Sequence, residues 1–228
     1  MRFFALTCLA LAALTEATSE ALSQGPTRLM IQTLQLNETI AKLAQTTKGF
    51  QKAHSRAVSH AYVGPILSFN FTDVSGAPLQ AVQWFFVGHD DKVDFKTPFL
   101  KHAADGVINQ TFVTMPNMSL ALDAPRGLYT QTLITSIPSS VNRTQLEHDS
   151  FLLAKSTLED GKAYSSTYGY GDNDEYVVLS GYRNPAQFVS WVTGLNETYK
   201  AIFDRWTSSF ADVPPPHFYT NFVQVPLL

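Results

Sequence analysis

The feature that most constrains the fold of this 228-residue chain is an internal similarity between segments 99 residues apart. Gln32-Thr33-Leu34 returns as Gln131-Thr132-Leu133, and Asp73 matches Asp172. Around these aspartates, SFNFTDVSGAPLQAV and TYGYGDNDEYVV both alternate aromatic and small residues, pass through a polar turn and enter an apolar run. Similarity at a fixed period indicates that one structural unit is built twice.

Hydrophobic periodicity predicts the same order of elements in each half: strand, helix, two strands, helix, strand. In the second half, a second helix precedes the last strand. Asn37 is expected to cap the first helix, whose apolar stripe ends at His54. The expected strands span 27–36, 61–71, 79–87, 117–123, 128–137, 163–172, 175–183 and 217–225, and the expected helices span 38–54, 95–105, 142–158, 185–194 and 197–210.

The order β-α-β-β-α-β is that of the ferredoxin-like unit. Its antiparallel sheet carries both helices on one face and leaves the other face apolar, so a single unit would expose that face to water. We therefore predict an α+β fold in which two tandem ferredoxin-like units, residues 25–124 and 125–228, pack sheet to sheet as a single-chain α+β barrel. The chain would be a monomer with an internal pseudo-dimer.

The glycine-rich stretch TYGYGD is interpreted as part of a β-hairpin, and the alternative is a phosphate-binding loop. Tyr164, Tyr168 and Tyr170 are expected on one strand face. Gly169 and Gly171 fall on the other, where a bulge or a close backbone approach favours glycine. The GxGxxG pattern is missing, and no helix is expected directly after these glycines.

Residues 1–19 have the pattern of a secretory signal peptide. Arg2 is followed by an apolar run over 3–14 and then by small and polar residues. The run is shorter than the roughly 20 residues that cross a bilayer. A core helix is the alternative. The only cysteine, Cys8, lies in this segment, so the mature chain would have no disulfide, thiolate or cysteine metal site.

Sequence signals for N-glycosylation support an extracellular location. The pattern Asn-x-Ser/Thr is more frequent than a chain of this length would show by chance, and predicts a secreted glycoprotein. A net charge of −3 and the lack of a basic cluster argue against a nucleic-acid partner. The predicted glycosylation sites are Asn37, Asn70, Asn109, Asn117, Asn142 and Asn196.

The chain resembles the dimeric α+β barrel superfamily, and within it the antibiotic-biosynthesis-monooxygenase-like domains. The clearest match is EYVVLSGYRNPAQFVSWVTG, which is similar to the central strand and short helix of that family. The resemblance implies a fused version of the usual dimer, with pockets between helices and sheet. It also implies that some relatives oxidise electron-rich polyketide phenols without metal or flavin, so no cofactor is expected. Others degrade haem or have no known reaction.

Five residues are candidates for such a site: His54, Trp84, Tyr168, Tyr182 and Arg183. A neutral His54 facing the sheet could act as a general base, or simply be a core or helix-end histidine. The Trp84 ring could stack on a ligand or belong to the core. The tyrosines could line a pocket or pack in ordinary strands, and Arg183 could bind an anion or end a strand in solvent.

The sequence lacks the residue patterns of metal sites and of the common hydrolases. The consecutive residues His89-Asp90-Asp91 diverge in an extended chain, and the DNDE turn lacks the spacing of a calcium loop. HExxH and GxSxG are missing, and no pair of carboxylates indicates a glycosidase. Two hypotheses follow: a secreted protein that binds or oxidises a small aromatic or polyketide-type molecule, or a non-catalytic secreted glycoprotein that binds a ligand or a surface partner.

Overall fold

The computed structural model describes residues 26–67, 79–88, 92–127, 129–159, 161–211, 213 and 218–224, without the side chains of 67, 185 and 218–224. The predictions for the signal peptide, for Asn70 and Asp73 and for the His89-Asp90-Asp91 run lie outside these residues.

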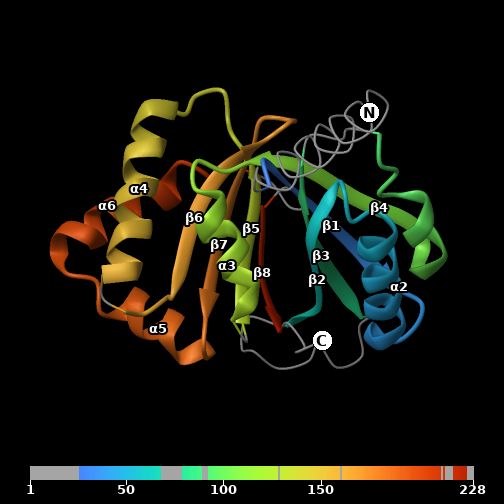
Figure 1. Ribbon diagram of the computed structural model, residues 1–228. Coiled ribbons are helices and arrows are strands. Elements are labelled where there is room, and N and C mark those ends of the chain that lie inside the picture. The colour runs from blue at the N-terminus through green and yellow to red at the C-terminus, as the bar shows by residue number, and fades with distance from the viewer. Residues whose placement is uncertain are drawn as a thin grey trace, which may run out of the picture.

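Within the residues described, eight strands form a closed barrel in which every pairing is antiparallel (Figure 1). The order around the barrel is β1-β3-β2-β8-β5-β7-β6-β4. The α+β class and the barrel are therefore confirmed. The strands are β1 (Arg28–Leu36), β2 (Val58–Leu67), β3 (Gln80–Val87), β4 (Ala103–Thr114), β5 (Tyr129–Ser136), β6 (Ser165–Gly171), β7 (Glu175–Tyr182) and β8 (Phe218–Gln224).

The helices cover two opposite sides of the barrel, with α2 on one side and α4, α5 and α6 on the other (Figure 1). Within the described part of the chain, no helix is long and apolar enough to cross a membrane. The helices are α2 (Ile40–Ala53), α3 (Met118–Asp123), α4 (Arg143–Glu159), α5 (Pro185–Thr193) and α6 (Glu197–Ser208), with two 3₁₀ turns, η1 (Thr97–His102) and η2 (Ala124–Arg126).

The barrel consists of two four-stranded halves joined along their edges. The first half has the order β4-β1-β3-β2, and the second has the order β8-β5-β7-β6. The joins are short: β2 pairs with β8 at Ile66 and Leu67, and β4 pairs with β6 at Val113 and Thr114. The halves thus meet edge to edge as well as through their inward faces.

Alternation along the strands sends side chains to two different cores. The inward set includes Ile31, Trp84 and Leu179, which come from both halves and share one cluster. The helix-facing set of the first half includes Met30 and Phe85, which pack with α2. Because β3 is covered on both faces, seven of its eight residues are buried.

The expected strand over 117–123 is wrong, because these residues form α3. The Asn117 side chain caps this helix by accepting a hydrogen bond from the Leu120 amide (3.0 Å). An Asn at this position favours helix initiation even where the following residues alternate in polarity. The strand that closes the first half is β4, which overlaps the end of the helix expected over 95–105.

The start of the first helix is also corrected. Thr39, not Asn37, precedes the first residue of α2. The Asn37 side chain instead donates from Nδ2 to the carbonyl of Lys101 (3.0 Å) and so ties the end of β1 to η1.

The hairpin over TYGYGD is confirmed as β6 and β7. Tyr168 and Tyr170 share a face and both contact the Tyr176 ring, with centroids 6.3 and 6.0 Å away. A Cβ on Gly169 would collide with the Thr114 carbonyl of β4, so glycine permits the close approach of the two strands. Tyr164 lies just before β6 and donates to the carbonyls of residues 123 and 124.

Candidate functional site

A cavity of about 250 Å³ lies in the second half, between the outer face of β5, β6 and β7 and the helices α4, α5 and α6. Figure 1 shows these helices standing over this part of the barrel. Its described lining combines aromatic rings, aliphatic side chains and uncharged polar groups. The lining includes Gln131, Ser150, Ser166, Tyr168, Tyr176, Ser180, Tyr182, Phe188, Trp191, Phe203 and Trp206.

The floor of the cavity is a row of polar side chains across three strands. The pairing sets Gln131 of β5 opposite Ser180 of β7, and Ser180 opposite Ser166 of β6. Residues directly opposite in a sheet point to the same face, so all three face the helices. Tyr182 lies two residues beyond Ser180 on that face. Serine side chains are short, and they leave space between the sheet and the helices.

Aromatic residues of α5 and α6 form the wall opposite this floor. Both helices start at an asparagine cap: Asn184 accepts from the Gln187 amide (3.2 Å) and Asn196 from the Tyr199 amide (3.0 Å). Asparagine side chains at this position satisfy amides that have no partner within the helix. The rings of Trp191 and Phe203 meet edge to face with centroids 5.9 Å apart. This arrangement places large apolar surfaces across from the polar row.

Hydrogen bonds fix the buried polar groups at the edge of the cavity. The Tyr176 hydroxyl donates to Ser150 Oγ (2.6 Å), and Trp206 Nε1 donates to the Tyr176 hydroxyl (3.3 Å). Trp191 Nε1 donates to Ser156 Oγ (3.2 Å). These bonds connect β7, α4, α5 and α6, so the wall and the floor are held in one arrangement.

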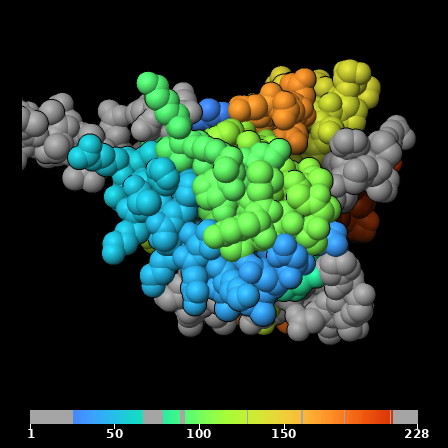
Figure 2. All heavy atoms as spheres, turned by 90° about the vertical axis from the view of Figure 1, so that its right-hand side faces the viewer, coloured from blue at the N-terminus to red at the C-terminus, as the bar shows by residue number. Residues whose placement is uncertain are grey.

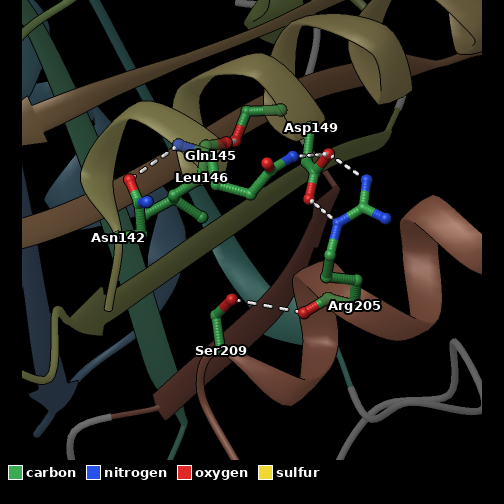
Figure 3. Close-up of polar contacts among 7 residues, drawn as sticks. Asn142, Gln145, Leu146, Asp149, Arg205 and Ser209 are labelled. Atoms are coloured by element: carbon green, nitrogen blue, oxygen red, sulfur yellow. Dashed lines mark hydrogen bonds and ion pairs between the residues drawn. The ribbon is translucent and has the colours of Figure 1, made fainter. Parts of the chain in front are cut away.

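An ion pair fastens α6 to α4 behind the wall (Figure 3). Asp149 of α4 is almost completely buried, and it accepts from Arg205 Nε (2.7 Å) and NH2 (2.5 Å) and from Gln145 Nε2 (2.9 Å). Burial alone would raise the pKa of Asp149, but the hydrogen bonds and the charge of Arg205 outweigh it and hold that pKa below its usual range. The carboxylate is therefore charged at neutral pH.

The lining itself carries no charge among the residues described. The titratable groups among the described lining residues are Tyr168, Tyr176 and Tyr182, and burial raises the pKa of each phenol. All three stay neutral at pH 7, so this lining offers hydrogen bonds but no general base that titrates near neutrality. In the described part of the chain, no group of three or more His, Cys, Asp or Glu residues could hold a metal ion.

The structure places two of the five predicted site residues in this cavity, Tyr168 and Tyr182. His54 lies at the end of α2, with its ring 4.5 Å from that of Phe50. Trp84 is fully buried inside the barrel, and its Nε1 has no hydrogen-bond partner among the described residues. Arg183 is exposed just beyond β7, and its amide donates to Gln187 (2.7 Å).

Sequence reasoning missed the polar row and the tryptophans of the wall. The sequence showed Gln131 only as part of the internal similarity, because its strand, YTQTLITS, mixes polar and apolar residues and gives no local sign that this glutamine faces a cavity. Trp191 and Trp206 lie on the apolar faces of their helices, a position that core tryptophans also occupy. Only the packing of the helices shows that these rings border a cavity.

The corresponding space in the first half is filled. The rings of Phe50, Phe85, Phe95 and Phe99 occupy it, with neighbouring centroids 5.3 to 5.5 Å apart. Gln83 crosses the remaining space and donates to Thr47 Oγ1 of α2 (2.7 Å). Figure 2 shows this side of the molecule, where α2 (blue) and the segment from η1 into β4 (green) lie against each other.

The predicted glycosylation sites within the described residues are all exposed. Three of them, Asn117, Asn142 and Asn196, cap helices through Oδ1. A glycan is attached to the other side-chain atom, Nδ2, so capping and glycosylation are compatible. Asn37 and Asn109 are the other two.

By sequence, the chain matches no family model and no curated protein. By structure, it is similar to a candidate monooxygenase of Fusobacterium nucleatum subsp. nucleatum, with a TM-score of 0.59 and 9% identity over 89% of this chain and 93% of that one. A candidate monooxygenase of Lactobacillus acidophilus gives 0.52 and 10% over 89% and 94%. An anthrone oxidase-like protein gives 0.50 and 11% over 88% and 92%. These likenesses show that the chain shares the α+β barrel fold of these proteins.

Proposed function

We propose that the cavity of the second half binds a small, neutral aromatic molecule, and that the protein oxidises it with molecular oxygen without metal or flavin. The observation that supports this proposal is a cavity of about 250 Å³ with aromatic walls and an uncharged polar floor. An apolar cavity of about 150 Å³ holds benzene. The larger volume here suits a ligand of about two fused rings.

The chemistry depends on the substrate more than on the protein. In an anthrone-type oxidation, a ring CH₂ becomes C=O: one atom of O₂ enters the product, and the other leaves as water with the two hydrogens of the CH₂. Because the described lining has no group that titrates near pH 7, the substrate must itself be acidic at carbon or oxygen. The aromatic walls would orient the ring and keep water out.

The runner-up is a non-catalytic secreted glycoprotein that binds a similar ligand. The same lack of a general base in the described lining favours it. The two functions share the binding step and differ only in oxygen consumption, so one set of measurements separates them.

We further propose that the halves, residues 25–124 and 125–228, are copies of one module, and that the protein is secreted after loss of residues 1–19 and is glycosylated. Support for the duplication comes from pairing: Gln32 faces Gln83 in the first half as Gln131 faces Ser180 in the second. Support for glycosylation comes from the exposure of every described acceptor asparagine.

The test uses the full secreted protein, equilibrium dialysis with 2-naphthol, and an oxygen electrode with 2-tetralone, a two-ring molecule with an acidic ring CH₂. Binding with oxygen uptake supports the oxygenase, and binding without uptake supports the runner-up. A lack of binding contradicts both. Ala154→Trp, which adds bulk to the cavity lining, should abolish binding. Arg183→Ala, an exposed change outside the cavity, should leave it unchanged.

A further inference from the structure

The polar row on the cavity floor contains more hydrogen-bond donors than its internal contacts use. Ser166 Oγ and Ser180 Oγ lie 2.9 Å apart, and both serines are buried. The Ser180 hydroxyl also forms a hydrogen bond with the Tyr182 hydroxyl, so neither serine hydrogen is left for a further acceptor.

Gln131 is oriented by its neighbour on the same row. Its Oε1 accepts a hydrogen bond from the hydroxyl of Tyr182 (3.3 Å). Burial keeps Tyr182 neutral, since it raises the pKa of the phenol, and a neutral phenol can donate this hydrogen. The other end of the Gln131 amide is an NH₂ group, which carries donors only.

Polar groups facing an apolar cavity favour ligands that satisfy them, because an unpaired buried donor is unfavourable. The opposite walls, with Trp191, Phe203 and Trp206, offer aromatic surface. A flat ligand would therefore lie against the rings with one polar edge on the row. No lining residue described carries a positive charge, so the row suits a neutral oxygen rather than a carboxylate.

We infer that the Gln131 amide NH₂ is a subsite for the acceptor oxygen of the ligand, a carbonyl of the ketone or quinone type conjugated to an aromatic ring, and that Ser166, Ser180 and Tyr182 hold this amide in place. This inference rests on the proposed function and narrows it, because it selects ligands by an acceptor oxygen. Tyr182 is a positioning residue in this arrangement, since it acts through Gln131.

The test compares 1-tetralone with tetralin, which have the same ring skeleton and differ by one carbonyl oxygen. Equilibrium dialysis of the full protein should give about tenfold tighter binding of 1-tetralone, the effect of one or two hydrogen bonds. Gln131→Leu, which removes the amide and keeps a side chain of similar size, should bring the ratio of the two affinities below about two. The affinity for tetralin should not fall.

Thr157→Val is the matched control. Thr157 also lines the cavity, but its hydroxyl is already bonded to the Leu153 carbonyl (2.7 Å) on the helix side. This variant should keep the preference of the wild-type protein for 1-tetralone. Tyr182→Phe provides a second variant should Gln131→Leu fail to fold, and it should reduce the preference because the amide loses the hydroxyl that orients it.

The outcomes separate this inference from the proposed function. Equal binding of the two probes by the wild-type protein, or an unchanged ratio in a folded Gln131→Leu or Tyr182→Phe variant, would overturn the subsite and leave an aromatic-binding cavity. Binding of neither probe would contradict the proposed function itself.

Discussion

The two halves of the barrel present the same strand order to their helices, yet one encloses a cavity and the other a solid core. In the first half, the space under α2 holds a cluster of phenylalanine rings. In the second half, the space under α4, α5 and α6 remains open over about 250 Å³. The comparison isolates what makes a binding site in this fold.

Two local differences account for the contrast. In the first half, Gln83 lies opposite Gln32 in the sheet. In the second half, the shorter Ser180 lies opposite Gln131. The connection after β3 is a 3₁₀ turn that inserts Phe99, whereas the connection after β7 forms two full helices. The fold therefore supplies the frame, and one side chain and one connection determine whether the space is filled.

The largest expected effect is on stability, when one aromatic ring is removed from the filled space of the first half and one from the cavity of the second half. Phe99 is fully buried among other aromatic rings, so Phe99→Ala should lower the free energy of unfolding by about 3–5 kcal/mol. The half-buried Phe188 already borders a cavity, so Phe188→Ala should lower it by only about 1–2 kcal/mol. Urea unfolding measures both. Equal losses would show that the second half is packed as tightly as the first.

The next effect concerns the way each half fastens its helices. Packing of α2 relies on aromatic contacts, whereas α6 is tied to α4 by Arg205 and the buried Asp149. Arg205→Met leaves that carboxylate without its cation, and we expect a melting temperature lower by a few degrees at pH 7. The matched control is Lys200→Met, which removes an exposed pair with Asp204 on the same helix and should change little.

The pH dependence of the Arg205→Met variant follows from the sign of the shift. In the wild-type protein, the pKa of Asp149 is lowered. The charged carboxylate therefore stabilises the folded state above the ordinary pKa of about 4, and this stabilisation is lost as the pH falls through the lowered pKa. Without Arg205, burial raises the pKa of Asp149. The difference in melting temperature between the wild-type protein and the variant should therefore shrink as the pH falls from 7 towards 5. A difference in melting temperature that stays constant over this pH range would contradict the role of the buried charge.

Much of the fold could be predicted from the sequence because strand alternation and helical periodicity are local signals. The hairpin of β6 and β7 was recognised from its tyrosines, glycines and polar turn. The error at 117–123 arose where a cap, Asn117, outweighed an alternating pattern. In β4, many exposed polar residues weaken the apolar alternation on which the prediction relied.

The site was harder to predict because β3 is buried on both faces. Trp84 and Gln83 are neighbours in sequence, but one points into the barrel and the other towards α2. A strand that is buried on both faces does not reveal which face meets the helices. Cavity volume depends in addition on side chains from three helices, which no local pattern contains.

The smallest expected effect is on ligand binding, when the residues at one corresponding position of the two halves are exchanged. Ser180→Gln places in the second half the residue that fills the first, and the longer side chain should extend into the cavity. We expect about tenfold weaker binding of 1-tetralone, equivalent to about 1.4 kcal/mol, in equilibrium dialysis. Gln83→Ser in the first half is the reciprocal control and should leave binding unchanged, because its partner Thr47 lies on the other side of the molecule. If Ser180→Gln binds the ligand as well as the wild-type protein does, the difference between the halves arises from their connections alone.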